Sequence, residues 1–404
     1  MSTATHDEID PSAPRTPPPP LLPPPRWTGA LSGLLAAAIA VAAGSLTAAL
    51  LGVVGPLDAV GSAFIDRTPT WLKDFAIGLF GTNDKLALRI GMVIVIGLVA
   101  AVLGVASLRW PWVGVAGIAG FGLVALLAAL ERPSEPPAAA VPPVVAVVAG
   151  VAALRLLISA TTGWWRETLV PGRSMSPAAT GRRRFLGTAG TMVAAAAVAG
   201  VAVPLLERRR LDAIGARAPA DLPPPSDPVS PAEFGTLDEI AGITPFVTAN
   251  DDFYRIDTAL RFPNINIDNW SVRIHGMVDR EISLSYDQLL ERPIVERAVT
   301  LCCVSNEVGG NLIGNAVWQG VLLAPLLEEA GVRPGVEQVF SESVDGFTCG
   351  FPVDAAFDRD CLIAIAMNGE PLPLAHGFPA RLVVPGLYGY VSATKWLSRI
   401  ELTT

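Results

Sequence analysis

The sequence predicts two structural classes in one chain, an all-α transmembrane bundle followed by an α+β domain. Of its 404 residues, 51% are hydrophobic and only 16% are charged, whereas soluble domains carry roughly 25% charged residues. Nearly all the long apolar runs lie before Leu206. This division predicts a membrane anchor over residues 30–206, a linker over 207–233 and a globular domain over 234–404.

Residues 1–29 are expected to form a disordered cytoplasmic tail. The segment is polar and rich in proline, with runs at Pro17–Pro20 and Pro23–Pro25, and it offers too little apolar surface to fold. No basic start precedes a short apolar core, so a cleavable signal peptide is not indicated there.

Five apolar segments then predict five transmembrane helices. Each is about 19 to 25 residues long, which is the length a helix needs to cross ~30 Å of hydrocarbon. They lack the polar face that helices of a soluble protein present to water. The segments are 30–54, 86–108, 110–130, 138–160 and 188–206.

Basic residues predict the orientation of the anchor. The connection 161–187 is rich in arginine and is therefore expected in the cytoplasm. Counting crossings from there places the N-terminus in the cytoplasm and everything after Leu206 outside, although Arg208–Arg210 oppose this orientation. The arginines of the connection are Arg166, Arg173, Arg182, Arg183 and Arg184.

The segment Gly181–Leu186 reads Gly-Arg-Arg-Arg-Phe-Leu and precedes the fifth apolar segment. It resembles the twin-arginine export signal, which serves proteins that fold before they cross the membrane. The alternative is that these arginines only anchor a helix end at the cytoplasmic face.

The globular domain mixes short strands with short helices. Strands are expected at Trp270–Val278 and Arg381–Val384, and helices at Ser285–Leu290 and Leu323–Ala330. Because they do not alternate strictly, an α+β domain is favoured over a doubly wound sheet. The net charge of −8 argues against a nucleic-acid partner. The chain has no GxGxxG, Walker or zinc-protease motif and no Cys-x-x-Cys spacing.

Segments between Pro245 and Glu401 resemble the molybdopterin domain of the sulfite oxidase superfamily, in their order and spacing more than in any one piece. Within this superfamily, the sequence resembles more closely the branch that reduces methionine sulfoxide. The segments are Thr248–Arg255, Leu301–Asn306, Gly314–Val321, Met367–Pro373, His376–Gly386, Tyr388–Gly389 and Ala393–Leu397.

The resemblance implies a molybdenum–molybdopterin cofactor with Cys303 as the catalytic metal ligand. The family pattern Leu-x-Cys-x-x-Asn places the ligand at Cys303, and a soft thiolate suits a redox-active metal. Cys302 would point the other way in an extended segment. The alternative for Cys303 is a small buried hydrophobic residue. No family role transfers to Cys349 or Cys361.

The resemblance also implies a set of residues that bind the cofactor. Arg381 offers a planar fork of donors to phosphate, His376 matches a histidine-or-asparagine position that holds the pterin, and Lys395 matches a phosphate-binding lysine. The remaining positions are Asn250, Asp251, Tyr254, Arg255, Ser343, Ala393 and Thr394. Solvated charge for Arg255 and Lys395, and a core aromatic for Tyr254, are the alternatives.

The implied reaction is oxygen-atom transfer at the metal. Sulfite-oxidising members carry arginines just after the ligand cysteine, where this chain has Glu307, Gly309 and Gly310. This favours reduction of a small or protein-bound S- or N-oxide, with methionine sulfoxide as a candidate. The alternatives are a sulfite dehydrogenase and an inactive membrane-bound scaffold.

Electrons are expected from a separate membrane carrier, either a haem protein or the quinol pool. The only histidines are His6, His275 and His376, and none lies in an apolar segment. Bis-histidine haem is therefore not expected in this chain.

Overall fold

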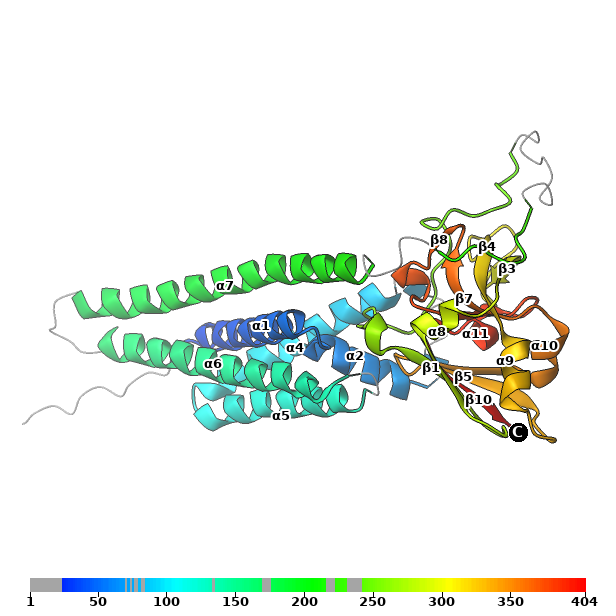
Figure 1. Cartoon of the computed structure of the whole chain (residues 1–404). Coiled ribbons are helices and arrows are strands. Elements are labelled where there is room, and N and C mark those ends of the chain that lie inside the picture. The colour runs from blue at the N-terminus through cyan, green and yellow to red at the C-terminus, as the bar shows by residue number, and fades with distance from the viewer. Residues whose placement is uncertain are drawn as a thin grey trace, which may run out of the picture.

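The computed structural model describes residues 24–404 except 70, 73–74, 76–78, 81–83, 133–134, 169–175, 216–221 and 231–241. A bundle of long helices occupies one end of the molecule, and a sheet domain occupies the other (Figure 1). The expected tail lies mostly outside the described residues, as does the expected start of the globular domain near Phe234.

Five helices of the bundle are long and apolar enough to cross a membrane. Each of the five predicted apolar segments lies largely within one of them, so the helical part of that prediction is confirmed. The helices are α1 (Arg26–Leu51), α4 (Asp84–Ser107), α5 (Pro111–Leu130), α6 (Val141–Thr168, preceded by the 3-10 turn η2, Pro137–Ala140) and α7 (Ser176–Gly215).

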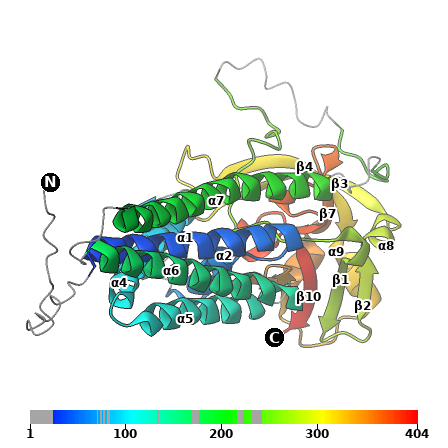
Figure 2. The same cartoon turned by 90° about the vertical axis from the view of Figure 1, so that its left-hand side faces the viewer.

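Small residues let these helices pack closely. A Cβ at Gly33 in α1 would overlap the carbonyl oxygen of Ala100 in α4, and a Cβ at Gly104 would overlap the carbonyl oxygen of Gly29. Such close backbone approach is typical of helix contacts in membranes. Figure 2 shows α6 and α7 on either side of α1, all running toward the sheet domain.

Two features of the bundle differ from the expectation. The helix α7 continues to Gly215, so 207–215 is helical in the segment for which we expected a linker. A further helix, α2 (Pro56–Arg67), was not expected, since it is short and carries Asp58, Asp66 and Arg67. Both place charged residues at the end of the bundle that meets the sheet domain.

The first sheet of the domain has the strand order β2-β1-β10-β5-β6. Strands β1 and β10 are parallel, while the other pairs are antiparallel. The strands are β1 (Ser271–Gly276), β2 (Ile282–Ser285), β5 (Gln338–Ser343), β6 (Thr348–Pro352) and β10 (Leu397–Thr403).

The second sheet has the order β3-β4-β7-β8, and β9 pairs with β7. Strand β7 is buried at every position, and the buried core includes Trp318 and Trp396. The strands are β3 (Ile294–Cys302), β4 (Ile313–Leu322), β7 (Leu362–Met367), β8 (Glu370–Pro371) and β9 (Arg381–Val383).

Short helices connect the strands, namely η5 (Ile267–Asn269), α8 (Tyr286–Leu290), α9 (Leu323–Ala330), α10 (Val353–Asp358), η6 (Leu374–His376) and α11 (Gly389–Ser392). The expected strands at 270–278 and 381–384 are confirmed as β1 and β9, and the expected helices as α8 and α9. Ser285 caps α8 through a capping box with Gln288.

Candidate functional site

The sequence-predicted site residues gather where several chain segments end. Cys303 follows the last residue of β3, His376 ends η6, Arg381 begins β9, and 393–395 follow α11. The segment 250–255 lies against them through contacts from Asn250 and Phe253. Ends of strands and short helices leave backbone groups and side chains free to face a ligand.

Arg381 is a buried cation whose hydrogen bonds all go to backbone carbonyls. Only 4% of the residue is exposed. Its Nη1 donates to the His376 carbonyl oxygen at 3.1 Å and its Nη2 to that of Ala393 at 3.4 Å, while its guanidinium lies 4.8 Å from the centre of the Trp318 ring. Burial lowers the pKa of Arg381 to about 10.

Within the described residues, Arg381 has no ion pair with a carboxylate. A buried charge without a counter-ion is costly, and a bound anion removes that cost. The burial of Arg381 therefore fits a site for a phosphate or another anionic group.

His376 is held as a neutral imidazole. Its Nε2 lies 2.9 Å from the Asn250 carbonyl oxygen, and because a carbonyl only accepts, Nε2 carries the proton. Burial lowers the pKa of His376 to about 4, with the nearby cations Arg381, Lys395 and Arg255 acting in the same direction. The Nδ1 atom is then an acceptor for a donor of the ligand.

The side chain of Asn250 joins the early segment to the turn after β7. Its Nδ2 donates to the Met367 carbonyl oxygen at 3.3 Å and to Glu370 Oε2 at 3.1 Å, and its Oδ1 accepts from Asn368 Nδ2 at 2.9 Å. The neighbouring Asp251 is exposed. Of the two predicted residues Asn250 and Asp251, Asn250 is the one whose backbone contacts His376.

Tyr254 links the cysteine segment to Arg381. Burial raises the pKa of Tyr254 to about 12, Arg381 opposes that rise, and Cys303 and Cys302 add to it. A Cβ at Gly389 would lie 3.3 Å from the Tyr254 hydroxyl and 3.9 Å from the Cys302 carbonyl oxygen. The hydroxyl therefore keeps its proton at neutral pH and can donate a hydrogen bond.

Cys303 stands at the start of a loop that closes on itself. Its backbone N–H donates to the Leu312 carbonyl oxygen at 2.9 Å, and Asn306 Oδ1 accepts from the Leu312 N–H at 2.8 Å. The residue is half-buried with a free thiol, as is Cys302. The described residues contain no cluster of three or more His, Cys, Asp or Glu that could hold a metal ion. A metal carried by an organic cofactor needs only one such protein ligand.

Lys395 is tied to the helix bundle through Asp257. Its Nζ lies 3.1 Å from Asp257 Oδ2, which also accepts from Arg255 Nε at 2.8 Å, while Lys85 Nζ of α4 lies 2.6 Å from Asp257 Oδ1. Burial lowers the pKa of Lys395 to about 8 against the opposing effect of Asp257. The three cations hold the pKa of Asp257 well below its usual range despite burial.

The hydroxyl cluster at Thr394 involves Ser341 instead of Ser343. Thr394 Oγ1 lies 2.7 Å from Ser341 Oγ and 3.0 Å from Cys349 Sγ. Ser343 is buried at the end of β5, where its Oγ accepts from the Asp345 N–H at 3.3 Å. Asp251 and Ser343 stand apart from the other predicted residues, and Arg255 joins the site through Asp257, which it shares with Lys395. The residues that the structure brings together are Asn250, Tyr254, Cys303, His376, Arg381, Ala393, Thr394 and Lys395.

Sequence reasoning missed three supporting residues. They are Asp257, Trp318 under Arg381, and Asn368, whose Oδ1 accepts from the Val317 N–H at 2.9 Å. The Asn368-Gly369 pair, with positive φ at both residues, is a turn signal visible in the sequence. Asp257 gives no such signal, because its partners are 138 and 172 residues away.

Comparisons with known proteins show similarity to molybdopterin-binding oxidoreductases. The family described as oxidoreductase molybdopterin binding domain matches residues 259–404. The chain is 37% identical over 134 residues to the uncharacterized oxidoreductase YuiH of Bacillus subtilis, covering 33% of this chain and 65% of that protein. It is 34% identical over 182 residues to mitochondrial sulfite oxidase of Rattus norvegicus, covering 39% and 33% of the two chains.

Two further proteins are similar to part of this chain. An NADH nitrate reductase of Nicotiana tabacum is 34% identical over 167 residues, covering 34% of this chain and 18% of that protein. The sulfane dehydrogenase SoxCD of Paracoccus pantotrophus is 27% identical, covering 40% and 45% of the two chains, with a TM-score of 0.37. The chain spans less than two thirds of the length of each of these relatives.

Proposed function

We propose that this chain, whose residues 259–404 are a molybdopterin-binding domain homologous to those of sulfite oxidase and nitrate reductase, is a membrane-anchored oxidoreductase that transfers an oxygen atom. The observation that carries the proposal is Arg381, a buried guanidinium without a carboxylate partner in the described chain, beside Lys395 and neutral His376. This donor set fits the phosphate and heterocycle of the cofactor.

In this proposal each site residue binds a different part of the cofactor. Arg381 and Lys395 hold the phosphate, with the backbone N–H of Thr394 beside them, while His376 and Asn250 orient the pterin. Ala393 acts through its carbonyl oxygen, which accepts from Arg381, because its N–H already donates to the Gly389 carbonyl oxygen at 3.0 Å. The Cys303 thiolate ligates molybdenum. The bound group supplies two-electron oxygen-atom chemistry. Tyr254 keeps its proton, so its hydroxyl is available as a donor near the Cys302–Cys303 segment.

The proposed substrate is an S- or N-oxide, including methionine sulfoxide in proteins. Glu307, Gly309 and Gly310 follow the ligand cysteine and are exposed, so this loop offers an anion such as sulfite no basic contact. A sulfite dehydrogenase is the second candidate, and the homology to sulfite oxidase favours it. A scaffold without activity is the third, and the unpaired Arg381 speaks against it.

We further propose that the bundle crosses the cytoplasmic membrane five times and holds the domain on the outer side. The five apolar helices and the arginines before the fifth support this topology. Arg183 and Arg184 lie within the helical part of the twin-arginine-like segment and are exposed. Electrons come from a separate haem protein or the quinol pool, because no apolar segment offers histidine ligands.

Metal content of the full-length protein tests the proposal directly. We expect about one molybdenum per wild-type chain, a loss of at least tenfold in Cys303→Ser, and near wild-type content in Cys302→Ser as the matched control. Absence of molybdenum from well-folded wild type would establish the scaffold alternative.

A substrate screen with the loaded enzyme separates the remaining alternatives. Reduction of sulfoxides with a dithionite-reduced dye and no oxidation of sulfite supports the proposal. Rapid sulfite oxidation with every sulfoxide untouched would instead make the chain a sulfite dehydrogenase.

A further inference from the structure

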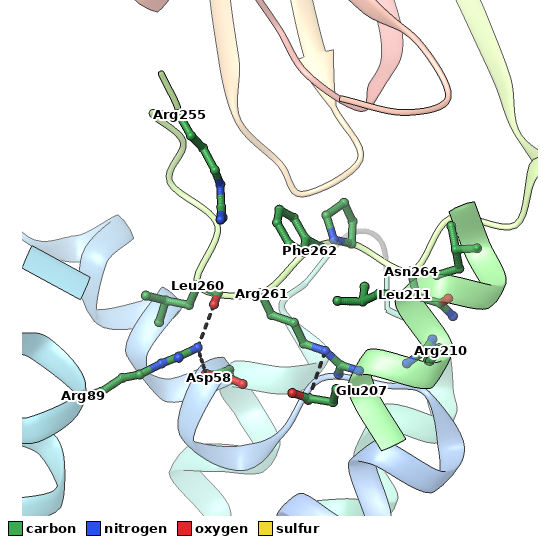
Figure 3. A pocket seen from close by; sticks show the side chains of 12 residues that line it. Asp58, Arg89, Glu207, Arg210, Leu211, Arg255, Leu260, Arg261, Phe262 and Asn264 are labelled. Carbon is green, nitrogen blue, oxygen red and sulfur yellow. Dashed lines mark hydrogen bonds and ion pairs between the residues drawn. The ribbon is translucent and has the colours of Figure 1, made fainter. Parts of the chain in front are cut away.

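A polar cavity lies where the anchor meets the sheet domain (Figure 3). Its volume is about 210 Å³, and its walls come from α2, α4, the end of α7 and the segment 255–264. The charged residues that line it are Asp58, Arg89, Glu207, Arg210, Arg255 and Arg261. Of these, only Arg255 is among the residues expected to bind the cofactor, and it pairs with Asp257 beside Lys395. The other five have no part in the proposed oxygen-atom transfer, so they could serve a different ligand.

Cations outnumber carboxylates in this lining by four to two. Arg89 pairs with Asp58 at 3.0 Å, and Arg261 lies 3.5 Å from Glu207. Within the described part of the chain, Arg210 donates from Nη2 to the Gly52 carbonyl oxygen at 2.6 Å, and its buried Nη1 has no partner there. Arg255 pairs at 2.8 Å with Asp257, which lies outside the lining. Three cations, Arg89, Arg210 and Arg261, therefore face two carboxylates in the cavity, and Arg210 adds an unused donor.

An apolar groove of about 480 Å³ starts directly beside this cavity. Its walls come from α1, α2, α4 and α7, and they are almost wholly aliphatic. Leu57 of the groove adjoins Asp58 of the cavity, Val93 lies one helical turn from Arg89, and Pro204 lies three residues before Glu207. The same helices thus carry the polar cavity and the apolar groove in consecutive turns.

We propose that the cavity and groove together bind one anionic phospholipid, its phosphate among Arg210, Arg261 and Arg89 and an acyl chain in the groove. The inference rests on the proposed membrane insertion and is independent of the metal chemistry. Ligand pockets for drug-sized molecules measure roughly 300–1,000 Å³, so the cavity suits a small head group whose tail lies elsewhere. Basic pockets between membrane helices bind anionic head groups in this way.

The charge excess distinguishes this ligand from a neutral amphiphile such as a quinone. A quinone ring offers acceptors but no negative charge, so it leaves the surplus cation uncompensated. A phosphate diester offers both charge and acceptors to the Arg210 guanidinium. Because Arg255, Leu260 and Arg261 belong to the sheet domain, the bound lipid also joins that domain to the bundle.

The test is mass spectrometry of lipid retained by the full chain purified in detergent, followed by titration with phosphatidylglycerol. Wild type is expected to retain about one anionic phospholipid per chain, and Arg210→Gln to bind phosphatidylglycerol about tenfold more weakly, because a charge-assisted hydrogen bond is lost. The double variant Arg208→Gln/Arg209→Gln removes more charge from exposed positions of the same helix and is expected to bind as wild type does.

A second pair of variants tests the groove. Gly200 lines the groove, and a Cβ added there would meet nothing within 4 Å, so Gly200→Leu fills the groove without a clash. The control Gly190→Leu adds the same side chain to α7 outside the groove. Only Gly200→Leu is expected to weaken retention.

Three results would overturn the inference: equal binding of phosphatidylglycerol and phosphatidylcholine, a co-purified quinone in place of phospholipid, or competition by inorganic phosphate with no effect of Gly200→Leu. Membrane extraction and molybdenum content of the same samples show separately whether insertion or cofactor loading has failed.

Discussion

The helix bundle, which we propose to be a membrane anchor, and the sheet domain are packed in opposite ways. In the anchor, Gly33 and Gly104 let backbones approach closely, and many large apolar side chains point outward. In the domain, large side chains such as Trp318 and Trp396 fill the interior. The first arrangement suits a lipid surround, where burying apolar surface yields little, whereas the second suits water. The same kind of substitution should therefore have different effects in the two regions.

The largest effect is expected from Gly33→Leu. The new side chain meets the Ala100 backbone, which cannot move aside without separating α1 from α4. We expect the full chain to disappear from the membrane fraction in an immunoblot. Gly120→Leu in α5, where a Cβ would meet nothing within 4 Å, is the matched control. Equal accumulation of both variants would contradict close packing in the anchor.

The domain should be most sensitive at Trp318. The ring is fully buried, its Nε1 donates to the Val299 carbonyl oxygen at 3.1 Å, and it lies under Arg381. We expect Trp318→Ala to cost about 3–5 kcal/mol of domain stability, measured by hydrogen exchange of β7. Trp112→Ala in the helix bundle, where 69% of the residue is exposed, should leave that exchange unchanged.

His376 should make the domain sensitive to acid. Because burial lowers its pKa to about 4, the unfolded chain, with a histidine pKa of about 6.5, binds a proton first as the pH falls. Stability is therefore lost between about pH 6.5 and pH 4, by on the order of 3 kcal/mol. His376→Asn should flatten this dependence in denaturant titrations of the full chain. An identical acid slope in the variant would refute a neutral buried imidazole.

The smallest effect concerns anion binding at Lys395. The pKa of Lys395 is about 8 in the free site, so above that pH an anion binds to the charged amine only if Lys395 first takes up a proton. Sulfate affinity of the cofactor-free chain should fall about tenfold per pH unit between about pH 8 and pH 9.5, as measured by calorimetry. Lys395→Arg should remove the dependence, because a guanidinium stays charged. A wild-type affinity constant over this range would show that Lys395 does not contact the anion.

The same contrast explains what could be predicted from the sequence. Helix length and composition fixed the five long helices, since bilayer thickness sets both. Helix α2 was not predicted because it is short and charged. The end of α7 was not predicted because the sequence of 207–215 resembles that of a linker. The site residues were predicted from the resemblance to a family. The supporting contacts could not be predicted, because they join residues far apart in the sequence: Thr394 contacts Ser341 and not Ser343, and Asp257 contacts both Lys85 and Lys395.

Asp257 has a consequence for how the two regions can change over time. One buried carboxylate serves Lys85 of the anchor and Lys395 of the site at once. A mutation of Lys85 therefore changes the charge balance around Lys395 without altering any residue of the sheet domain. The helix bundle is therefore not an interchangeable support: a bundle from another chain would keep this charge balance only if it brought a base to the position of Lys85.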